Sequence, residues 1–562
     1  MEEVVKQLTK IISQEFGVDV RPRVEPSEHA DFASNVAMQI AKQVERNPRA
    51  VGEKLAASLA ATGIKVEVAG PGFLNFTLAD SDLVAELVAS VERPDEFYKC
   101  STYQDKVVVT EFSDPNPFKV LHVGHLYTSV VGNAISNLIE RAGGKVHRVN
   151  FGGDVGLHVA KTMWAIKQQL GEFDVVRLPS GEIAERMDWI AARYVEGTNA
   201  YEDSEAAKTE IVELNKAIYQ LTAAGDHSSD VAQVYWQCRA WSYEYFDAFY
   251  ARMQVEFEKY YPESETAGLG LETVRNNIKA GGYEESDGAV VFKGEPYGLH
   301  TRVFINKEGL PTYEAKDVGL LQKKWQDYQF DLSVVITGAD ITEYMKVVLK
   351  SVEQFAPTLS ERTRHIVHGN VKLAGGVKMS SRKGNFLRAV EVLDMVAAEQ
   401  RTATGAADEV VVLGAVKYAL LKPKIEPGEI IFSVKESVSL QGDSGPYLQY
   451  SLARAKSILR GVAEAGELSG DLSSFDLDEF ERALLLALLE WRQVLGLAVD
   501  ELAPHRVCTY IYKLAQKFSR FYENDRVAGS GKVALRQKLV QGYVQVLEEC
   551  LAILGVPSVE RI

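Results

Sequence analysis

The chain has 562 residues and a formal net charge of −16, and 46% of its residues are hydrophobic. A chain of this length usually forms several domains and can bury a core without disulfides or a structural metal. The acidic balance is unfavourable for non-specific binding to nucleic acid, although basic residues gathered on one face can still provide a binding surface.

The four cysteines are far apart in the sequence, at Cys100, Cys238, Cys508 and Cys550. They form no CxxC or Cys/His cluster, which argues against a zinc site and against a disulfide framework and fits a reducing compartment. The N-terminal stretch MEEVVKQLTKIISQEF is acidic and amphipathic, unlike a signal peptide. No apolar run approaches the ~20 residues that cross a bilayer. We therefore expect a cytoplasmic protein with no membrane contact.

Residues 1–100 are expected to form a small α/β domain. Apolar residues recur at helical spacing in Val4–Ile12 and Ala33–Val44, and Lys65–Leu78 alternates like a strand interrupted by a Gly-Pro-Gly turn. Polar residues at Pro94–Glu96 indicate a linker to the next domain.

The second expected domain, residues 101–435, begins with the pattern of a parallel sheet. Val107–Thr110 is a short β-branched run typical of a buried strand, and a proline-rich loop follows it. Helical spacing then runs from about Gly124 to Arg141, and Lys145–Asn150 begins the next strand. Strand, loop, helix and strand in this order predict a βαβ unit.

The remaining elements are predicted from their periodicity. A helical insertion is expected at about residues 160–290, and a third, helical domain at residues 436–562. The expected helices of the insertion are Ile183–Tyr194, Glu205–Ala223 and Val231–Met253, and the later strands are Gly288–Lys293, Thr301–Asn306 and Leu332–Thr337. Gly466–Ser474 is typical of a linker within the helical domain.

The first candidate site is His122-Val-Gly-His125, where the loop after the first strand turns into a helix. A helix N-terminus offers unpaired backbone N–H groups and partial positive charge, so phosphate binds there readily. Gly124 allows a base or phosphate to approach the backbone closely. The two imidazoles can donate to phosphate oxygens, or they can be capping or core residues, and this short pattern fits both interpretations.

The second candidate site is the basic stretch Lys378–Lys383 (KMSSRK), which glycines bracket. Cationic side chains with hydroxyls and glycine hinges suit a mobile clamp over a polyphosphate, although such a loop on its own is usually only a solvated surface. Its position downstream of an HxGH helix start, with a βαβ unit between them, makes the pair far more specific than either motif alone.

Together these motifs resemble those of class I aminoacyl-tRNA synthetases, in which HIGH and KMSKS contact ATP. The resemblance implies a Rossmann-type catalytic domain and electrostatic stabilisation of the phosphates during adenylate formation. It implies ATP contacts from His122, Gly124, His125, Lys378, Met379, Ser380 and Ser381. It implies catalytic roles for His122, His125, Lys119 and Lys378. Mg²⁺ is expected on the phosphates, and no zinc is expected.

The flanking residues resemble the arginyl family of these enzymes. The segment Glu111–Asn116 (EFSDPN) is similar to the family's EFSSPN, Val149–Gly156 (VNFGGDVG) to VNxxGDWG, and Pro311–Asp317 (PTYEAKD) to the TYxxxD helix. The matching positions predict an arginine pocket lined by Glu111, Asn116, Tyr313 and Asp317. Carboxylates and a phenol are suitable acceptors for the five donors of a guanidinium.

Three positions depart from the family pattern. Ser381 stands where KMSKS has its second lysine, and Lys119 can supply charge from the other side. Tyr127 replaces an arginine that often follows HVGH-Leu. Ile341 replaces a glutamine that lines the pocket in some relatives, so a changed pocket geometry is expected.

Both ends of the chain also resemble the arginyl family. The segment from Gly445 to Arg460 resembles the start of the helical anticodon-binding domain, and His29–Ala37 and Ala69–Phe76 resemble the additional N-terminal domain that contacts tRNA. Exposed aromatics stack on unpaired bases while cations hold phosphates. The expected tRNA contacts are Tyr447, Tyr450, Arg454, Arg460, Asn35 and Phe32.

The resemblance therefore implies a monomeric arginine-tRNA ligase that uses ATP, L-arginine and tRNA(Arg) and that needs bound tRNA before it activates arginine. Three alternatives remain. Other class I synthetases often carry zinc-binding cysteines or editing domains, and neither is evident here. A small nucleotidyltransferase does not need a helical C-terminal domain. A catalytically inactive RNA-binding paralogue is disfavoured because both phosphate motifs and the pocket acids are retained.

Overall fold

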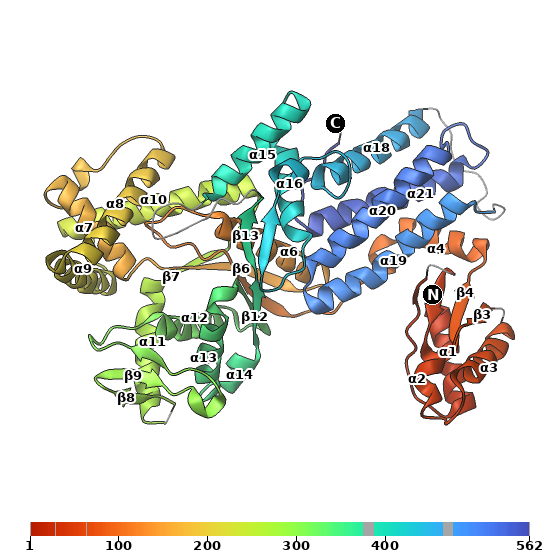
Figure 1. Cartoon of the computed structure of the whole chain (residues 1–562), viewed down its shortest axis with the longest axis horizontal. Coiled ribbons are helices and arrows are strands. Elements are labelled where there is room, and N and C mark those ends of the chain that lie inside the picture. The colour runs from red at the N-terminus through yellow and green to blue at the C-terminus, as the bar shows by residue number, and fades with distance from the viewer. Residues whose placement is uncertain are drawn as a thin grey trace.

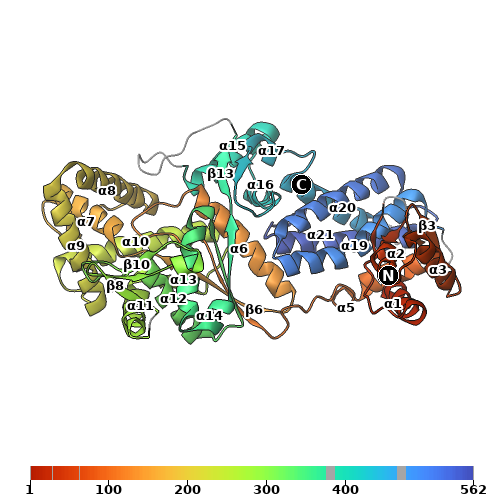
Figure 2. The same ribbon diagram turned by 60° about the horizontal axis from the view of Figure 1, so that its bottom comes forward.

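The structure is a computed structural model that describes residues 2–27, 30–62, 64–280, 282–374, 387–464 and 476–560. Its parts lie in a row, with the insertion helices at one end, the central sheet in the middle, and the helical and N-terminal domains at the other end (Figures 1 and 2). This arrangement confirms the predicted class of a parallel-sheet domain between an N-terminal α/β unit and a C-terminal helical unit.

The N-terminal unit is a four-stranded antiparallel sheet, ordered β1-β2-β4-β3, with helices packed on it. Its elements are α1 (Glu2–Phe16), β1 (Glu25–Pro26), β2 (Phe32–Ser34), α2 (Val36–Ala41), α3 (Pro48–Ala60), β3 (Lys65–Ala69) and β4 (Phe73–Thr77). The strand predicted with an interruption at Gly-Pro-Gly is the antiparallel pair β3 and β4, which the turn joins. Gly72 has φ +131°, and a Cβ there would lie 2.7 Å from the Pro48 carbonyl, so only glycine fits. The helical spacing over Ala33–Val44 is wrong at its start, because Phe32–Ser34 pair with β4.

The connection to the sheet domain contains α4 (Asp80–Glu92) and α5 (Pro94–Phe97). The expected linker at Pro94 therefore forms one short helix. The side chain of Arg482 bonds Asp31 and Asp80, which ties the N-terminal unit to the C-terminal helices. The N-terminal unit thus lies against the helical domain and away from the central sheet (Figure 1).

Five parallel strands form the central sheet in the order β12-β11-β5-β6-β7. They are β5 (Val107–Glu111), β6 (Lys145–Gly152), β7 (Lys259–Pro262), β11 (Leu332–Gly338) and β12 (Thr363–His368). The predicted βαβ unit is confirmed, with α6 (Val123–Arg141) between β5 and β6. From β5 the chain builds outward to β7 and then returns to β11 on the other side of β5. Ligands bind at the carboxyl ends of strands where the order reverses in this way.

Long helices separate β6 from β7, and a small antiparallel sheet, ordered β10-β9-β8, separates β7 from β11. The first group is α7 (Leu157–Leu170), η1 (Val175–Arg177), α8 (Ile183–Asp203), α9 (Glu205–Ala224) and α10 (Asp230–Met253). The second is α11 (Glu263–Ile278), β8 (Glu284–Ser286), β9 (Ala289–Phe292), η2 (Glu295–Tyr297), β10 (Arg302–Ile305) and α12 (Tyr313–Tyr328). After β11 come η3 (Ala339–Ile341), α13 (Thr342–Glu353) and α14 (Pro357–Glu361). The three predicted insertion helices and the three later strands are confirmed.

The C-terminal part is helical, as predicted, apart from the parallel pair β13 (Asn370–Leu373) and β14 (Glu429–Phe432). Its helices are α15 (Ala389–Thr404), α16 (Glu409–Leu421), α17 (Val434–Ser437), α18 (Gly445–Glu464), α19 (Glu479–Glu501), α20 (Pro504–Asn524) and α21 (Val533–Ile553). The predicted linker at Gly466–Ser474 lies outside the described residues.

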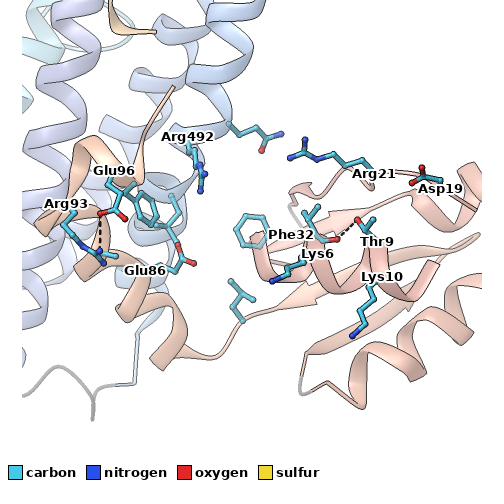
Figure 3. A pocket seen from close by; sticks show the side chains of 16 residues that line it. Lys6, Thr9, Lys10, Asp19, Arg21, Phe32, Glu86, Arg93, Glu96 and Arg492 are labelled. Carbon is cyan, nitrogen blue, oxygen red and sulfur yellow. Dashed lines mark hydrogen bonds and ion pairs between the residues drawn. The ribbon is translucent and has the colours of Figure 1, made fainter. Parts of the chain in front are cut away.

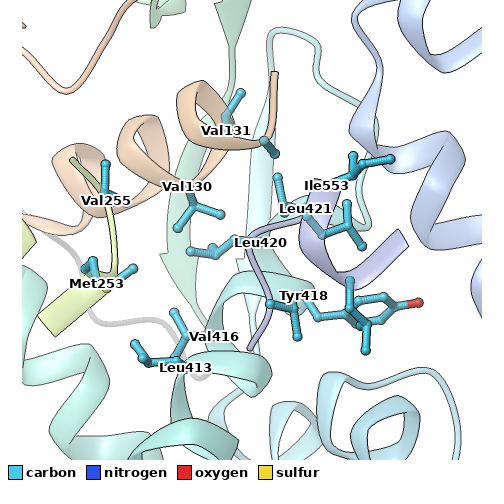
Figure 4. Close-up of a cluster of buried hydrophobic side chains, with 14 of the residues drawn as sticks. Val130, Val131, Met253, Val255, Leu413, Val416, Tyr418, Leu420, Leu421 and Ile553 are labelled. Carbon is cyan, nitrogen blue, oxygen red and sulfur yellow. The ribbon is translucent and has the colours of Figure 1, made fainter. Parts of the chain in front are cut away.

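One continuous hydrophobic core joins the sheet domain to these helices. Val130 of α6 lies beside Leu420 of α16, and Leu413 of α16 and Ile553 of α21 belong to the same cluster of buried side chains (Figure 4). Helix α6 is therefore held firmly, which fixes the position of its N-terminal end. Within the part of the chain that the structure describes, no helix combines the length and apolarity needed to cross a membrane.

Candidate active site

The loop that follows β5 is held in an unusual backbone conformation. Ser113, Asp114 and Phe118 have φ values of +74°, +47° and +67°, a region that residues other than glycine seldom adopt. Helix α10 holds this loop, because the Ser113 hydroxyl lies 2.8 Å from that of Tyr250 and the Phe118 N–H donates to the Ser242 hydroxyl at 2.9 Å. The strain is maintained by packing at the carboxyl edge of the sheet, where a ligand is expected.

His122 and His125 both cap helix α6 and are arranged to donate hydrogen bonds. The Nδ1 atom of His122 accepts from the Gly124 N–H at 3.0 Å, and Nδ1 of His125 accepts from the His122 N–H at 3.1 Å. An Nδ1 that accepts carries no proton, so each neutral ring carries its proton on Nε2. Burial, followed by Lys119, lowers the pKa of His122 to about 4. Burial also lowers the pKa of His125 well below its usual range.

Capping and phosphate binding are therefore compatible functions of one histidine pair. The caps use the Nδ1 atoms and fix the tautomer that makes Nε2 a donor. Gly124 is required here, because a Cβ at that position would lie 2.8 Å from the His122 ring. The expected close approach to the Gly124 backbone is thus made by the His122 side chain itself.

The described chain that follows the second motif in the sequence lies next to the first motif. Lys378, Met379, Ser380 and Ser381 lie outside the described residues. The chain that follows them is hydrogen-bonded to the HVGH segment, since the Val123 N–H donates to the Leu387 carbonyl at 3.0 Å and the Ala389 N–H donates to the Leu121 carbonyl at 3.0 Å. Leu387 and Ala389 are thus anchored beside the start of α6.

Lys119 and His368 complete this end of the site. The ammonium of Lys119 lies 4.7 Å from the centre of the Tyr194 ring and is close enough to depress the pKa of His122 and His125. His368, at the end of β12, has its Nε2 atom 2.8 Å from the Thr128 hydroxyl on α6. The sequence did not identify His368, although a histidine followed by Gly-Asn at the end of a strand was a usable signal.

Glu111 lies at the carboxyl end of β5 and forms a buried ion pair with Lys324 of α12. Glu111 is 3% exposed and Lys324 is 0% exposed. The ammonium of Lys324 also lies 3.1 Å from the Ser333 hydroxyl of β11. The expected pocket acid is therefore in place, but a cation from the chain already contacts it. The sequence analysis did not predict this partner, although Lys324 lies seven residues, or two helical turns, after Asp317.

Two further carboxylates lie around this ion pair. Asp317, on α12, accepts a hydrogen bond from the Tyr344 hydroxyl. Burial, the Glu111 carboxylate and the Glu263 carboxylate raise the pKa of Asp317 to about 8. Asp114, in the loop after β5, accepts from the Phe151 N–H at 2.9 Å. Burial and Glu111 raise its pKa well above the usual range, with a smaller contribution from Asp317.

Asn116 and Tyr313, the other two expected arginine contacts, lie at the same edge of the sheet. The Asn116 side-chain oxygen accepts from the Gly153 N–H at 3.0 Å, which joins the loop to the end of β6. Tyr313 begins α12 and is 56% exposed. Beneath it, Lys316 and Glu263 form a buried ion pair of 2.6 Å. All four predicted arginine contacts thus come from β5, its loop and α12.

The two remaining departures from the family pattern are placed differently. Tyr127 is fully buried, with its ring 4.7 Å from that of His368, so it belongs to the core beneath the histidines. Ile341 ends the short helix η3 directly after β11. It therefore lies at the carboxyl edge, on the same segment that leads into the Tyr344 helix.

The predicted tRNA contacts divide into exposed and buried residues. Arg454 of α18 lies between the rings of Tyr450 and Tyr522, 4.7 and 5.0 Å from their centres. Both tyrosines are exposed, and Tyr522 was not among the predicted contacts. Tyr447 and Arg460 are partly buried on the same helix, and Asn35 is exposed at the start of α2. Phe32 is only 2% exposed and packs in the N-terminal core, which leaves its ring no face for a base.

Two other features were considered as sites. Among the described residues, one group of carboxylates has metal-ligand spacing, at Asp478, Glu481 and Asp525, and Arg536 bonds all of them. A cavity of about 1000 Å³ lies between α1 and the helices α4 and α19, far from the sheet edge. Its lining mixes Lys6, Lys10 and Arg21 with acidic side chains (Figure 3).

Comparisons with known proteins match the chain along most of its length. A family model described as "Arginyl tRNA synthetase N terminal domain" matches residues 1–78. One described as "tRNA synthetases class I (R), catalytic domain" matches residues 88–424, and "DALR anticodon binding domain" matches residues 448–562. The arginine–tRNA ligase of Porphyromonas gingivalis is 28% identical over 571 residues, covering 94% of this chain and 93% of the relative.

Two solved structures have the same fold. The arginyl-tRNA synthetase of Thermus thermophilus covers 100% of both chains with a TM-score of 0.78 and 24% identity. That of Plasmodium falciparum gives a TM-score of 0.78 with 19% identity and covers 100% of this chain and 99% of its own.

Proposed function

Because the chain belongs to the class I arginyl-tRNA synthetases, we propose that it activates L-arginine with ATP and transfers the arginyl group to the 3′ end of tRNA(Arg). The arginine carboxylate attacks the α-phosphorus of ATP in line and displaces pyrophosphate. A terminal ribose hydroxyl of the tRNA then attacks the activated carbonyl and releases AMP. The observation that carries the proposal is a group of acidic side chains and two imidazoles with Nδ1 capping helix α6, all at the carboxyl edge of one sheet.

We assign ATP to the start of α6 and to the KMSSR segment. His122, Gly124 and His125 surround the helix N-terminus, whose partial positive charge favours phosphate. Because both rings are neutral, they donate to the phosphate oxygens without a change in protonation. Lys119 and Lys378 supply positive charge where charge builds up on the phosphates. Mg²⁺ would be held by the phosphates and water, because this hard cation prefers oxygen ligands, and it would neutralise part of the phosphate charge.

We assign arginine to the acid pocket. Glu111 ends β5 and pairs with Lys324, Asn116 lies in the loop after β5, and Tyr313 and Asp317 lie on the first turns of α12. A guanidinium is charged at every accessible pH and matches carboxylates as a planar fork. No lysine or arginine among the described residues forms an ion pair with Asp317. The guanidinium of the substrate therefore supplies the positive charge that this carboxylate lacks.

The tRNA is assigned to the N-terminal unit (residues 1–100) and the helical domain (residues 436–562), which flank the catalytic domain (residues 101–435). The stack of Arg454 between two exposed tyrosines supports base and phosphate contacts there. Asn35, Tyr447, Tyr450 and Arg460 are the other proposed contacts, and Phe32 supports the N-terminal core. We further propose that the protein acts as a cytoplasmic monomer and that tRNA must bind before arginine is activated.

The test of this function is aminoacylation of unfractionated tRNA with each of the twenty labelled amino acids, in the presence of ATP and Mg²⁺. Charging with arginine alone is the expected result. Charging with another amino acid contradicts the pocket assignment, and tRNA binding without any charging identifies an inactive paralogue. ATP–pyrophosphate exchange with and without tRNA tests the tRNA requirement, and equal rates contradict it.

A further inference from the structure

The lysines near the carboxyl edge of the central sheet are held in two different ways. Lys316 and Lys324 are each buried in an ion pair with a glutamate. Lys119, in the loop after β5, forms no hydrogen bond and no ion pair among the described residues, and its ammonium lies 4.7 Å from the centre of the Tyr194 ring. Within the described part of the chain, no carboxylate therefore neutralises Lys119.

The ammonium of Lys119 lies among the histidines of the proposed ATP site. Its positive charge lowers the pKa values of His122, His125 and His158. The face of an aromatic ring attracts a cation but does not neutralise it. A carboxylate would compete with phosphate for the ammonium, whereas a ring leaves its N–H groups able to donate to phosphate oxygens. The contact with Tyr194 thus suits a lysine whose charge is used by ATP.

Tyr194 is carried by a part of α8 that is packed firmly. The neighbouring Arg193 is 9% exposed, and its guanidinium lies 5.4 Å from the centre of the Trp189 ring. One turn further on, a Cβ at Gly197 would lie only 2.0 Å from the Lys161 carbonyl, so α8 and α7 are in close backbone contact. The backbone that carries the Tyr194 ring is therefore fixed against α7.

Helix α8 also contacts the chain beside the start of α6. Asp188 forms an ion pair with Arg388, and Arg388 pairs with His122 in an isolated antiparallel bridge. Tyr194 lies further along the same helix. One helix of the insertion thus contacts both the lysine of the β5 loop and the segment that pairs with the HVGH motif.

We propose that Tyr194 is a positioning residue, whose ring holds the ammonium of Lys119 where the phosphates of ATP bind. The role of Tyr194 rests on the proposed function, because it requires ATP beside Lys119. Without the ring, the flexible lysine side chain loses the one contact that orients its ammonium among the described residues. The insertion then contributes to adenylate formation through a side chain that does not itself touch ATP.

The experiment measures initial rates of tRNA arginylation by the full-length chain as a function of ATP and of arginine. Y194L keeps an apolar side chain but removes the ring. A partly desolvated cation–π contact corresponds to about 5- to 30-fold, so kcat/KM for ATP falls by that factor while the arginine KM stays the same. Y194F keeps the aromatic face and stays within about twofold of the wild type.

Y201L is the matched control. Tyr201 lies on the same helix, and the ammonium of Lys161 lies 4.5 Å from the centre of its ring. The variant therefore removes an equivalent contact from α8 without affecting Lys119, and it leaves both kinetic constants unchanged.

A double-mutant cycle shows whether Tyr194 acts through Lys119. Y194L lowers kcat/KM for ATP in the wild-type background, but it has no further effect in K119M, where the cation is already absent. A tyrosine that only packs α8 would lower the value by the same factor in both backgrounds.

Ring electronics provide a second test if Y194L does not fold. Trifluorophenylalanine at position 194 has nearly the shape of phenylalanine, but fluorine withdraws electron density from the ring face that attracts the cation. The trifluorophenylalanine protein should have a lower kcat/KM for ATP than Y194F. Equal values overturn the inference.

The outcomes separate the inference from the proposed function. Equal kcat/KM values for ATP in Y194L and Y201L overturn the role of Tyr194, while arginylation by the wild type leaves the proposed function intact. A change confined to the arginine KM also overturns it, since it shows that Tyr194 acts through Tyr313, whose pKa it affects. If the wild type does not charge tRNA with arginine, the proposed function fails and the inference fails with it.

Discussion

The acidic groups of the helical domain and of the catalytic domain are neutralised by the chain to very different extents. In the helical domain, Arg536 bonds Asp478, Glu481 and Asp525 at 3.3, 2.7 and 2.7 Å, and Lys532 adds a contact of 2.8 Å to Glu481. The cluster in the helical domain is thus balanced by cations of the chain itself.

In the catalytic domain, Lys324 bonds Glu111, while Asp114 and Asp317 have no ion-pair partner among the described residues. Buried carboxylates without a cation are unfavourable, which is why the pKa of Asp317 is raised to about 8. The difference indicates that the helical cluster is structural, whereas the pocket lacks a cation that the substrate supplies.

The largest expected effect comes from unbalancing the helical cluster. Arg536→Met leaves three neighbouring carboxylates without their shared partner, and breaking a buried ion pair in this way costs about 3–5 kcal/mol. Thermal unfolding of the variant should show a clearly lowered first transition. The arginine KM, measured well below that transition, should equal the wild-type value. An unchanged transition would show that the network does not stabilise the domain.

The next effect comes from replacing Asp317, an acid that has no cationic partner in the described part of the chain. Asp317→Asn should lower kcat/KM for arginine about 100-fold, or about 3 kcal/mol, because charge-assisted contacts to the guanidinium are lost. Thermal stability at pH 7 should not fall, since the amide replaces a carboxyl group whose pKa is raised to about 8 and which is already mostly neutral. A variant that loses stability but keeps its arginine KM would place Asp317 with the structural acids.

Proton linkage gives a smaller effect. In the protein without arginine, burial raises the pKa of Asp317 to about 8, so this carboxyl group is mostly protonated at pH 7. It must lose that proton to pair with a guanidinium. The kcat/KM for arginine should therefore increase with pH, by roughly tenfold from pH 7 to well above 8. Asp317→Asn should remove this rise. A flat profile in the wild-type protein would mean that Asp317 is already ionised before arginine binds.

The smallest effect concerns a cation without an acidic partner. Arg454, in the helical domain, forms no ion pair among the described residues. Tyr522→Ala removes one face of its stack, so the KM for tRNA should rise about fivefold, corresponding to ~1 kcal/mol of base stacking. Tyr297→Ala is the control, since Tyr297 and Tyr522 are both 44% exposed. Equal tRNA KM values in the two variants would argue against a tRNA contact at this stack.

The sequence predicts the parts of this molecule that depend on local periodicity. The β-branched run of β5, the helix that HVGH starts and the strand residues on either side of Gly72 follow from spacing and turn chemistry. The helix predicted over Ala33–Val44 begins too early, because Phe32–Ser34 pair with β4 and tertiary pairing overrides local apolar spacing.

The candidate site is less predictable where it depends on long-range contacts. Glu111 and Asp317 stand out in the sequence, but Lys324 resembles its neighbour Lys323, which is paired at the surface with Asp327. Only the packing of α12 on the sheet determines that Lys324 points inward to Glu111. Asp114 likewise lies in the segment that resembles the family motif. The position of its side chain depends on a backbone conformation that Tyr250 and Ser242 of α10 help to hold.

The central claim, that uncompensated acids select a cationic amino acid, is tested most directly by comparing arginine with citrulline. Citrulline has nearly the same shape but a neutral ureido group. In tRNA-dependent ATP–pyrophosphate exchange, the wild-type protein should favour arginine by about 10⁴-fold or more in kcat/KM, and D317N should lose much of that preference. A preference that persists undiminished in D317N would contradict the account.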